Sequence, residues 1–534
     1  MKKIRPKINQ VLLGGLTVVL LCAVIVVSPA CGRRAPALKH VIFFIGDGMS
    51  AQTEVAASRY LYGRDDGLAW QKFPGQAYVA TWDVNVYNGN ARRALRPPYS
   101  RSSFTALLGY DVGTYGSRPR VGGDDVVAFP FGPATDSASA ATALATGFKT
   151  DSGNISWLPG DPPAGELTTI TEEYRTKTGA GIGVVSTVPF NHATPAAFVS
   201  HNPNRNAYYS GRKGYKGLGL ADEIILRVKP DVVIGGGHPL LDNPDFNPKQ
   251  GYISKSLYLG LKASPDYLLV ERTPGADGGR AIVEGAAAAL RAGKKLFGLF
   301  GGKGGNFDIA QAEDSPGRPR VTSGSEENPS LAEATVGALD YLGADPDGFF
   351  LVVEQGDIDW ANHDNDFRGM VACVADLDGA VRAATAFVDR PGDTVDWTNT
   401  VLLVTADHAT GGLVLDGAKR RGLGDLPRQD PRVAYPEAPP PTGSDRGLSP
   451  NGAALKTPVY ASPNVYPDED IFYGTAGHTN ELVDLGVTGA ATRYFMKYRG
   501  TWYPGLILDN TQINSALREA LGLGALGRRA ARGT

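Results

Sequence analysis

Cysteine and histidine are scarce in this chain of 534 residues, and neither sign of charge is in excess. Three cysteines are too few for a disulfide framework, which excludes a small scaffold held together by disulfide bonds. The formal net charge of −2 gives no reason to expect nucleic acid or an anionic membrane surface as a binding partner. Only seven histidines are present, so their clustering with acidic residues is informative.

An apolar stretch near the start of the chain is typical of an export signal. Basic side chains within residues 2–7 precede the apolar residues 11–27, and small residues follow. We therefore expect an exported protein in the periplasm or cell envelope. Ala30 followed by Cys31 resembles a bacterial lipoprotein processing site, which predicts a leader at 1–31 and membrane attachment through a lipid on Cys31. Simple cleavage of the leader and an uncleaved anchor remain the alternatives.

Continuous apolar runs alternate with helical segments along the rest of the chain. Runs rich in Val, Ile, Leu and Phe are typical of strands that are buried on both faces. A capping box of Ser330 and Glu333 marks the start of one of two predicted helices, 279–291 and 330–342. This alternation predicts an α/β fold with a mainly parallel central sheet and helices on both faces. The predicted strands are 40–45, 182–187, 231–234, 295–300, 349–354 and 400–405.

The α/β pattern runs through residues 38–510, and we expect one large domain there with a C-terminal helix and basic tail at 511–534. Proline, glycine and charged residues interrupt it at 85–130, 313–329 and 416–470, which we expect to be loops or insertions. The last of these either shapes substrate access or is a surface elaboration.

Aspartate and histidine occur where predicted strands end. Asp47 follows the strand at 40–45, while Asp407 and His408 directly follow the strand at 400–405. Ligands bind at the carboxyl ends of strands in open α/β sheets. An isolated aspartate in such a place is most often a turn or cap residue, but agreement between several strands favours a shared site.

Two further clusters add to this pattern. Asp359 and His363 stand four residues apart, so one helical turn places both on the same face, and His478 lies in a glycine-containing turn. A hydrolytic zinc site needs three protein ligands of nitrogen and oxygen type and one open position. Taken together, the four clusters could hold two divalent metal ions.

A serine is placed to act as a nucleophile beside them. Ser137 follows Asp136 and precedes small helix-forming residues, and Gly147 is a plausible helix end. Backbone N–H groups and the dipole at a helix N-terminus favour an anion such as phosphate. On local sequence alone, an ordinary helix N-cap is the favoured interpretation of Ser137, and only its company with the other clusters favours a nucleophile.

These segments, in this order, resemble those of the metal-dependent alkaline phosphatases over roughly residues 38–510. The family's D-S-A motif corresponds to Asp136, Ser137 and Ala138. The resemblance implies a catalytic domain with this α/β fold, in which Ser137 attacks phosphorus and a phosphoserine forms. It also implies broad phosphomonoester substrates and a homodimer.

The resemblance further implies two zinc ions and one magnesium ion. One zinc is expected at Asp359, His363 and His478. The second is expected at Asp47, Asp407 and His408, with Ser137 completing its ligands. The magnesium is expected at Asp47, Thr194 and Glu354, an oxygen-rich set that suits this ion.

Other positions are implied to act on the phosphate or on the ligands. Arg205 corresponds to the family's phosphate-binding arginine, which Asp136 would help to hold. His192 stands where some bacterial members carry aspartate, and Trp360 stands where members carry lysine, histidine or tryptophan. Both would tune metal affinity without changing the class of reaction, and His192 could make the third site less selective for magnesium.

The expected function is therefore that of a phosphomonoester hydrolase. A phosphodiesterase of the same metal-dependent superfamily is the first alternative, because it could share the zinc ligands. A non-catalytic surface lipoprotein that binds phosphate is the second. Retention of Ser137 argues against the second, because binding alone requires no nucleophile.

Overall fold

The computed structural model describes residues 38–110, 134–240, 251–302, 304–415, 421–428 and 471–526. The described residues belong to one compact unit. The predicted leader with Cys31 and most of the stretch 416–470 lie outside the described residues. Within the described ranges, no helix is both long and apolar enough to cross a membrane.

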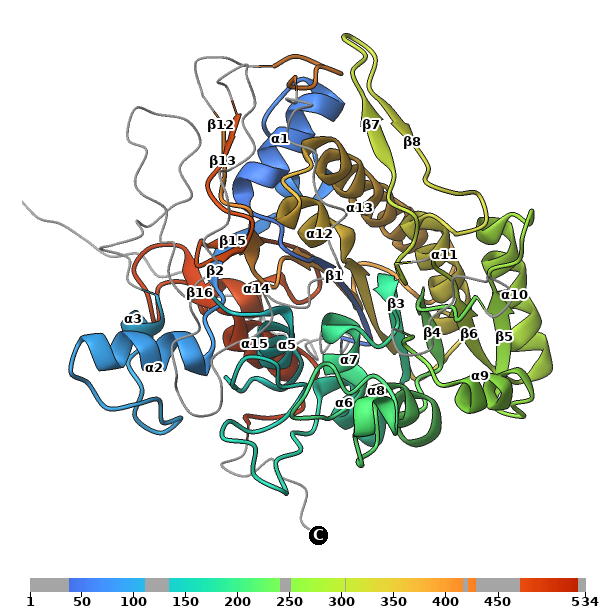
Figure 1. Ribbon diagram of the computed structural model, residues 1–534, viewed down its shortest axis with the longest axis horizontal. Coiled ribbons are helices and arrows are strands. Elements are labelled where there is room, and N and C mark those ends of the chain that lie inside the picture. Colours follow the sequence, from blue (N-terminus) through green and yellow to red (C-terminus); the bar gives the residue numbers. More distant parts are fainter. Residues whose placement is uncertain are drawn as a thin grey trace, which may run out of the picture. The chain divides into compact units, whose positions relative to one another are not determined.

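A sheet of ten strands forms the centre of this unit (Figure 1). The strand β15 runs antiparallel to both of its neighbours, β10 and β2, whereas the other neighbouring strands pair in parallel. The predicted mainly parallel sheet is confirmed. In spatial order the strands are β16 (Ile507–Asp509), β2 (Gly75–Ala80), β15 (Val483–Gly489), β10 (Thr400–Thr405), β1 (His40–Gly46), β9 (Phe349–Gln355), β3 (Gly181–Pro189), β4 (Val232–Gly236), β6 (Lys295–Leu299) and β5 (Tyr267–Glu271).

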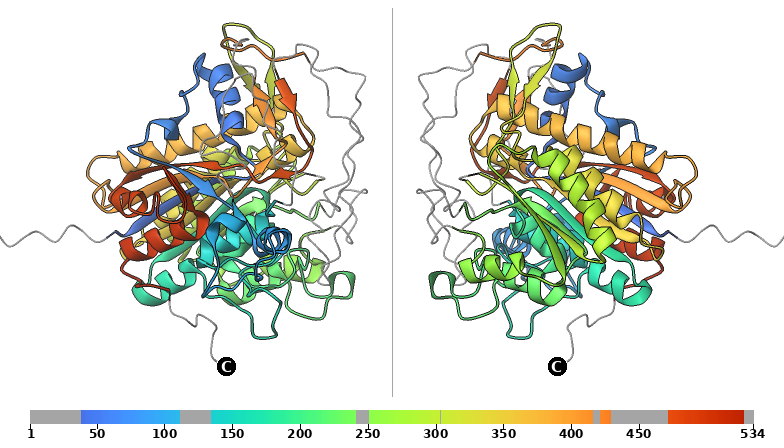
Figure 2. Two further views of the ribbon diagram at one scale, coloured as in Figure 1. Left: turned by 90° about the vertical axis from the view of Figure 1, so that its left-hand side faces the viewer. Right: turned by 90° about the vertical axis from the view of Figure 1, so that its right-hand side faces the viewer.

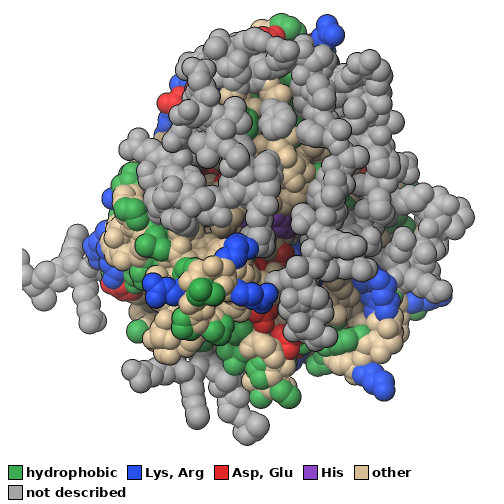
Figure 3. Space-filling model, turned by 60° about the vertical axis from the view of Figure 1, so that its left-hand side comes forward, with side chains coloured by type: hydrophobic (Ala, Val, Ile, Leu, Met, Phe, Trp, Pro, Cys, Tyr) green, Lys and Arg blue, Asp and Glu red, His purple; other side chains and the backbone are tan. Residues whose placement is uncertain are grey.

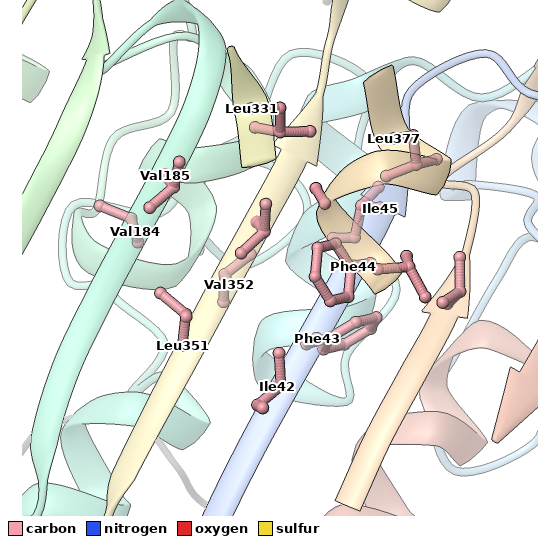
Figure 4. Close-up of a cluster of buried hydrophobic side chains, with 14 of the residues drawn as sticks. Ile42, Phe43, Phe44, Ile45, Val184, Val185, Leu331, Leu351, Val352 and Leu377 are labelled. Carbon is pink, nitrogen blue, oxygen red and sulfur yellow. The ribbon is translucent and has the colours of Figure 1, made fainter. Parts of the chain in front are cut away.

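The central strands are the apolar runs recognised in the sequence. Every residue of β1, β9, β3 and β10 is buried, because helices cover both faces of the sheet. Side chains of neighbouring strands pack together and against the helices, as Phe44, Val352 and Leu377 do in Figure 4. Burial of such side chains is the main source of stability for this core.

Helices lie on both faces of the sheet, as predicted (Figures 1 and 2). One face carries α10 (Gly278–Ala292), α11 (Leu331–Leu342) and α13 (Phe367–Val388), with α1 (Ala51–Tyr62) packed on α13. The other carries α5 (Ser137–Thr146), α6 (Ile170–Thr178), α7 (Ala193–Val199), α14 (Thr492–Met496) and α15 (Asn510–Ala520). The predicted capping box of Ser330 and Glu333 begins α11. Cys373 is buried within α13 as a free thiol.

Two of the three expected insertions contain regular structure. The segment 85–130 includes α2 (Val84–Arg93) and α3 (Ala106–Gly109), because aromatic rings such as Tyr87 and Phe104 pack around Trp82. The segment 313–329 overlaps a hairpin of β7 (Gln311–Glu313) and β8 (Arg320–Thr322). Residues 421–428 of the third contain no helix or strand.

The remaining elements are short and lie between the larger ones. They are η1 (Ala69–Lys72), η2 (Arg212–Gly214), α8 (Leu220–Asp222), the π-helix η3 (Glu223–Val228), α9 (Lys255–Lys262), α12 (Asp357–His363), and the paired strands β11 (Ala409–Thr410) with β14 (His478–Thr479) and β12 (Leu413–Leu415) with β13 (Ile471–Tyr473).

Candidate metal centre and nucleophile

The carboxyl ends of three adjacent strands bring the predicted acidic residues together. Strand β1 lies between β9 and β10 and is parallel to both. Asp47 follows β1, α12 with Asp359 follows β9, and Asp407 follows β10. Parallel strands end at the same edge of a sheet, so residues that are far apart in sequence become neighbours.

Asp47, Asp407 and His408 lie together and form the first group of candidate metal ligands. The Nε2 atom of His408 lies 3.3 Å from Asp47 Oδ1 and 3.3 Å from Asp407 Oδ2. The ligand atoms of the three side chains all lie within 4.8 Å of one another, and all three side chains are buried. This arrangement suits one metal ion with mixed nitrogen and oxygen ligands.

Asp359, His363 and His478 form the second group. His363 Nε2 lies 3.3 Å from Asp359 Oδ2 and 3.1 Å from His478 Nε2, while His478 Nε2 lies 3.6 Å from Asp359 Oδ1. The Nδ1 atom of His363 faces the carbonyl oxygen of Ala476 at 2.6 Å, and that of His478 faces the carbonyl oxygen of Thr135 at 2.8 Å. Since a carbonyl only accepts, both Nδ1 atoms donate, and in the neutral form of each ring the Nε2 atom keeps a lone pair for a metal.

The two groups touch through His408. Its ring stacks on His478 with centroids 3.7 Å apart, and Asp359, His408 and His478 also bring ligand atoms within 4.8 Å of one another. Thr410, which the sequence did not single out, donates its hydroxyl to Asp359 Oδ1 at 2.5 Å and lies 3.3 Å from His408 Nδ1. The only sequence hint of this role is its position two residues after His408.

Buried negative charge dominates the cluster. Burial raises the pKa of Asp47 well above its ordinary value, and the carboxylates of Asp407, Asp359 and Glu354 raise it further. Burial and neighbouring carboxylates likewise raise the pKa of Asp407 to about 8. Burial also tends to raise the pKa of Asp359, but the nearby histidines His363 and His478 more than offset it and hold that pKa well below its usual range. A divalent cation would neutralise this excess of carboxylates.

The residues of the predicted magnesium site also meet. Glu354 is fully buried, and burial raises its pKa to about 7, although Thr194 and Asp47 lie close enough to lower it. Among the described residues, no hydrogen-bond partner is found for Glu354 Oε1, Thr194 Oγ1 or Asp407 Oδ2, although all are buried. Such oxygens are costly unless a ligand satisfies them, so the residues present fit a hard cation.

His192 and Trp360 lie beside these ligands. His192 is the N-cap of α7, two residues before Thr194, and its ring meets the Trp360 ring edge-on at 6.1 Å. Burial, with the charge of Arg205, lowers the pKa of His192 to about 3, so the ring is neutral. A neutral imidazole offers a lone pair to a metal.

The serine hydroxyl reaches the first ligand group. Ser137 Oγ lies 3.1 Å from His408 Nε2 and 3.5 Å from Asp47 Oδ1. Ser137 is the first residue of α5, whereas Asp136 is the N-cap and accepts a hydrogen bond from the Ser139 N–H at 3.0 Å. The alternative that Ser137 is merely the N-cap is therefore wrong. Gly147 ends the helix as predicted, with φ of 74°.

Asp136, the residue before Ser137, holds Arg205 in place. The Nη1 atom of Arg205 donates to Asp136 Oδ2 at 2.9 Å, and both side chains are buried. Burial alone would raise the pKa of Asp136, but the Arg205 guanidinium and hydrogen bonds from Ser139 more than offset it and keep the carboxyl ionised. Arg205 is thus oriented by a charge-assisted hydrogen bond.

The cluster is partly open to the outside. The side chains of His363 and His478 are 12% and 10% exposed, whereas that of His408 is fully buried. Figure 3 shows a histidine side chain at the surface next to acidic side chains.

Sequence comparisons agree with the geometry. The profile of the alkaline phosphatase family matches residues 128–434. The chain is 33% identical to alkaline phosphatase 4 of Bacillus subtilis, over 53% of this chain and 50% of that protein. It is 30% identical to alkaline phosphatase 3 of the same organism, over 70% of this chain and 62% of that protein. The chain thus spans about half to three-fifths of the length of these relatives.

The protein is of the α/β class, with a ten-stranded central sheet and a cluster of aspartates and histidines at the carboxyl ends of its strands. The fold is similar to the crystal structure of the Thermus thermophilus alkaline phosphatase, with a TM-score of 0.56, 22% identity and 92% of each chain covered. This chain belongs to the alkaline phosphatase family.

Proposed function

We propose that this protein hydrolyses phosphate monoesters through a phosphoserine at Ser137, at a site for two zinc ions and one magnesium ion. The observation that carries the proposal is the placement of the Ser137 hydroxyl 3.1 Å from His408 Nε2, within the two groups of metal ligands. A binding protein would need neither a nucleophile nor this contact.

We assign each metal ion to a group of residues by the type of ligand atom that the group offers. Bound divalent ions would favour the alkoxide of serine, stabilise negative charge on oxygen and lower the pKa of water. Zinc suits the groups that contain histidine, and magnesium suits the oxygens of Glu354 and Thr194. The buried Nδ1 atom of His192 keeps open our hypothesis that zinc competes for the third site, which metal analysis after growth in zinc-rich medium would test.

The chain's own residues bind and orient the phosphoryl group. Arg205 presents a planar guanidinium whose N–H groups match two phosphate oxygens, and Asp136 fixes its orientation. The first N–H groups of α5 surround Ser137 and favour an anion. Both features hold phosphorus close to the Ser137 oxygen, which lowers the entropic part of the barrier.

Two displacements then complete the reaction. In the first, Ser137 Oγ forms a bond to phosphorus while the ester oxygen leaves and takes up a proton. In the second, a water oxygen bonds to phosphorus, the bond to Ser137 Oγ breaks, and phosphate is released. Inversion at each step returns the phosphate with retained configuration.

The Ser137→Ala variant tests the nucleophile. We expect kcat for a chromogenic phosphate monoester to fall by about a thousandfold or more, because the covalent route is lost. Acid quenching of the unaltered enzyme during turnover, followed by peptide mass spectrometry, should find phosphate on Ser137. Ser330→Ala is the matched control, since it removes a serine at the start of α11 and should leave kcat unchanged. Full activity of Ser137→Ala would exclude the proposal.

The alternatives differ in their preferred substrate. A phosphodiesterase would hydrolyse a chromogenic diester faster than the monoester, whereas a phosphate-binding lipoprotein would hydrolyse neither. We expect the monoester to react faster, because it carries up to two negative charges and keeps a third unesterified oxygen when Arg205 binds two, whereas a diester carries one charge and has only the two. Faster diester hydrolysis by the purified chain would replace our proposal with the first alternative.

We also propose export to the periplasm or cell envelope, a lipid on Cys31 and a homodimer. The basic and apolar leader supports export, and the family resemblance supports the dimer. Mass spectrometry of the mature N-terminus tests the lipid: an unmodified N-terminus downstream of Cys31 would exclude it. Light scattering of the purified protein tests the dimer, and a monomeric mass would exclude it.

A further inference from the structure

A buried histidine that takes no part in the proposed chemistry lies just before Arg205. His201 stands two residues beyond the end of α7 and four residues before Arg205. Its ring Nε2 lies 3.0 Å from Glu172 Oε2, and its Nδ1 lies 3.3 Å from Glu223 Oε2. Its backbone N–H also donates to Glu223 Oε2. His201 therefore connects α6 and the π-helix η3 to the segment that leads to Arg205.

Both ring nitrogens face carboxylates, which favours the imidazolium form. A neutral imidazole has one N–H and could donate to only one of the two glutamates, leaving a lone pair against the other. Burial opposes the charge of His201, but hydrogen bonds to Glu172 and Glu223 outweigh it and raise its pKa to about 9. Arg227 donates to Glu223 Oε1 and to Glu166, so both of these charged side chains also belong to the cluster.

Backbone hydrogen bonds connect His201 to the phosphate-binding side. Asn202 and Ile155 exchange two backbone hydrogen bonds of 2.8 Å each, and the Arg205 N–H donates to the Gly153 carbonyl at 2.8 Å. The Gly153 N–H in turn donates to Asp136 Oδ2, the same oxygen that holds the Arg205 guanidinium. The segment from 201 to 205 is thus fixed at one end by the glutamates and at the other by Asp136.

We propose that His201 is a positioning residue, whose imidazolium fixes residues 201–205 and thereby holds Arg205 where the phosphoryl group binds. The inference rests on the proposed phosphomonoesterase function. Because Arg205 contacts the phosphoryl group in both the ground state and the transition state, its displacement weakens binding more than it slows the chemical step. His201 acts through Arg205 and does not touch the substrate.

Kinetics of His201→Gln on the metal-loaded full chain test this role. We expect KM for a chromogenic monoester and the inhibition constant of inorganic phosphate to rise about tenfold, with kcat changed less than about twofold. His40→Gln is the matched control, because His40 is also buried but opens β1 at the opposite end of the strand from Asp47. Unchanged KM and phosphate inhibition in His201→Gln would overturn the proposal, as would equal effects in both variants.

The pH dependence gives a second readout that a merely structural role would not change. In the unaltered chain, the phosphate inhibition constant should rise above about pH 9, as His201 loses its proton. Glu223→Gln removes one carboxylate partner of His201 and should move that rise to lower pH. Glu166→Gln should leave the rise where it is, because Glu166 pairs with Arg227 and not with His201. A rise that is identical in all three proteins would contradict the proposal.

One measurement keeps the inference separate from the proposed function and from any folding defect. Histidine-selective NMR labelling of the unaltered chain should show one imidazole that titrates near pH 9. The His201 signal is the one that disappears in His201→Gln. If it titrates with the ordinary midpoint of histidine, His201 is not an imidazolium at neutral pH and the proposal fails. Absence of monoester hydrolysis by the unaltered chain would instead reject the proposed function and leave the His201 titration as a structural result.

Discussion

At the scale of single residues, the main feature is the compensation of buried carboxylate charge by neighbouring cations. Asp47, Asp407 and Glu354 are buried together, and burial is the largest cause that raises the pKa of each. Buried ions are tolerated when an opposite charge compensates them. Arg205 provides that compensation for Asp136, and we propose that metal ions provide it for Asp47, Asp407 and Glu354.

The charge of His201 predicts a pH-dependent difference in stability. Its pKa of about 9 in the folded chain lies above the ordinary 6.5, so its stabilisation is fully present below pH 6.5 and is lost as the pH rises through 9. Denaturant unfolding should show that His201→Gln is less stable than the unaltered chain by up to about 3 kcal/mol at pH 7, with a much smaller difference at pH 10.

His40→Gln is the control for that measurement. Burial lowers the pKa of His40 to about 4, so its protonation does not change between pH 7 and pH 10. The stability difference for His40→Gln should therefore stay constant over that range. A constant difference for His201→Gln as well would show that His201 is not charged in the folded protein.

Some candidate site residues could be predicted from local spacing, whereas the assignments of Thr194, Glu354 and Arg205 rest on the family resemblance. Asp407 and His408 are adjacent, and Asp359 and His363 share one helical turn. Thr410 and His201 could not, because their partners come from elsewhere: Thr410 meets Asp359 of α12, and His201 meets glutamates of α6 and η3. The separation of these residues in the sequence does not predict such tertiary contacts.

At the scale of elements, the turn between β1 and α1 determines how closely two ligand-bearing segments approach. Gly48 has φ of 70°, and its N–H donates to Asp407 Oδ1 at 3.2 Å. A Cβ atom added at Gly48 would lie 2.7 Å from the Cα of Asp359, which is backbone and cannot move aside easily. Both the backbone conformation and the space require glycine here.

Gly48→Ala should therefore separate Asp359 from the cluster. We expect kcat/KM for a monoester to fall by about a hundredfold or more, together with a loss of bound zinc. Gly63→Ala is the matched control, because Gly63 also has positive φ, at 65°, yet a Cβ there meets only Leu423 at 3.7 Å. That control should lose about 1 kcal/mol of stability and keep its activity. Equal activity in the two variants would show that the turn does not set the site.

The elements differ in how well the sequence predicts them. The central strands are fully buried and therefore appear as unbroken apolar runs. β15 contains Asp484 and two glycines, and β5 is only partly buried, so neither gives a clear run. The helices α2 and α3 lie in a proline- and arginine-rich segment, where aromatic packing against Trp82 outweighs local composition.

At the scale of the whole molecule, metal binding and folding should be coupled. A ligand that binds only the folded state stabilises it in proportion to the logarithm of its concentration. Removal of metal by a chelator should therefore lower the Tm by about 5 °C or more, because several buried carboxylates lose their compensating charge.

Asp47→Asn should reverse this effect. It removes one buried carboxyl that interacts with three others, so the metal-free variant should melt at or above the Tm of the metal-free unaltered chain. With zinc and magnesium present, the variant should melt below the unaltered chain, since a shared ligand is lost. A variant that is less stable in both conditions would show that Asp47 has a structural role without metal.

The central claim is that separate strand ends converge to bind metal ions around a reactive serine. The most direct test is the rate of hydrolysis of a chromogenic phosphate monoester after exhaustive chelation, followed by stepwise addition of zinc and magnesium with bound metal measured in parallel. The account predicts that activity disappears with the metals and returns as about two zinc ions and one magnesium ion bind per chain. Full activity in metal-free protein, or none after metals have bound, would contradict it.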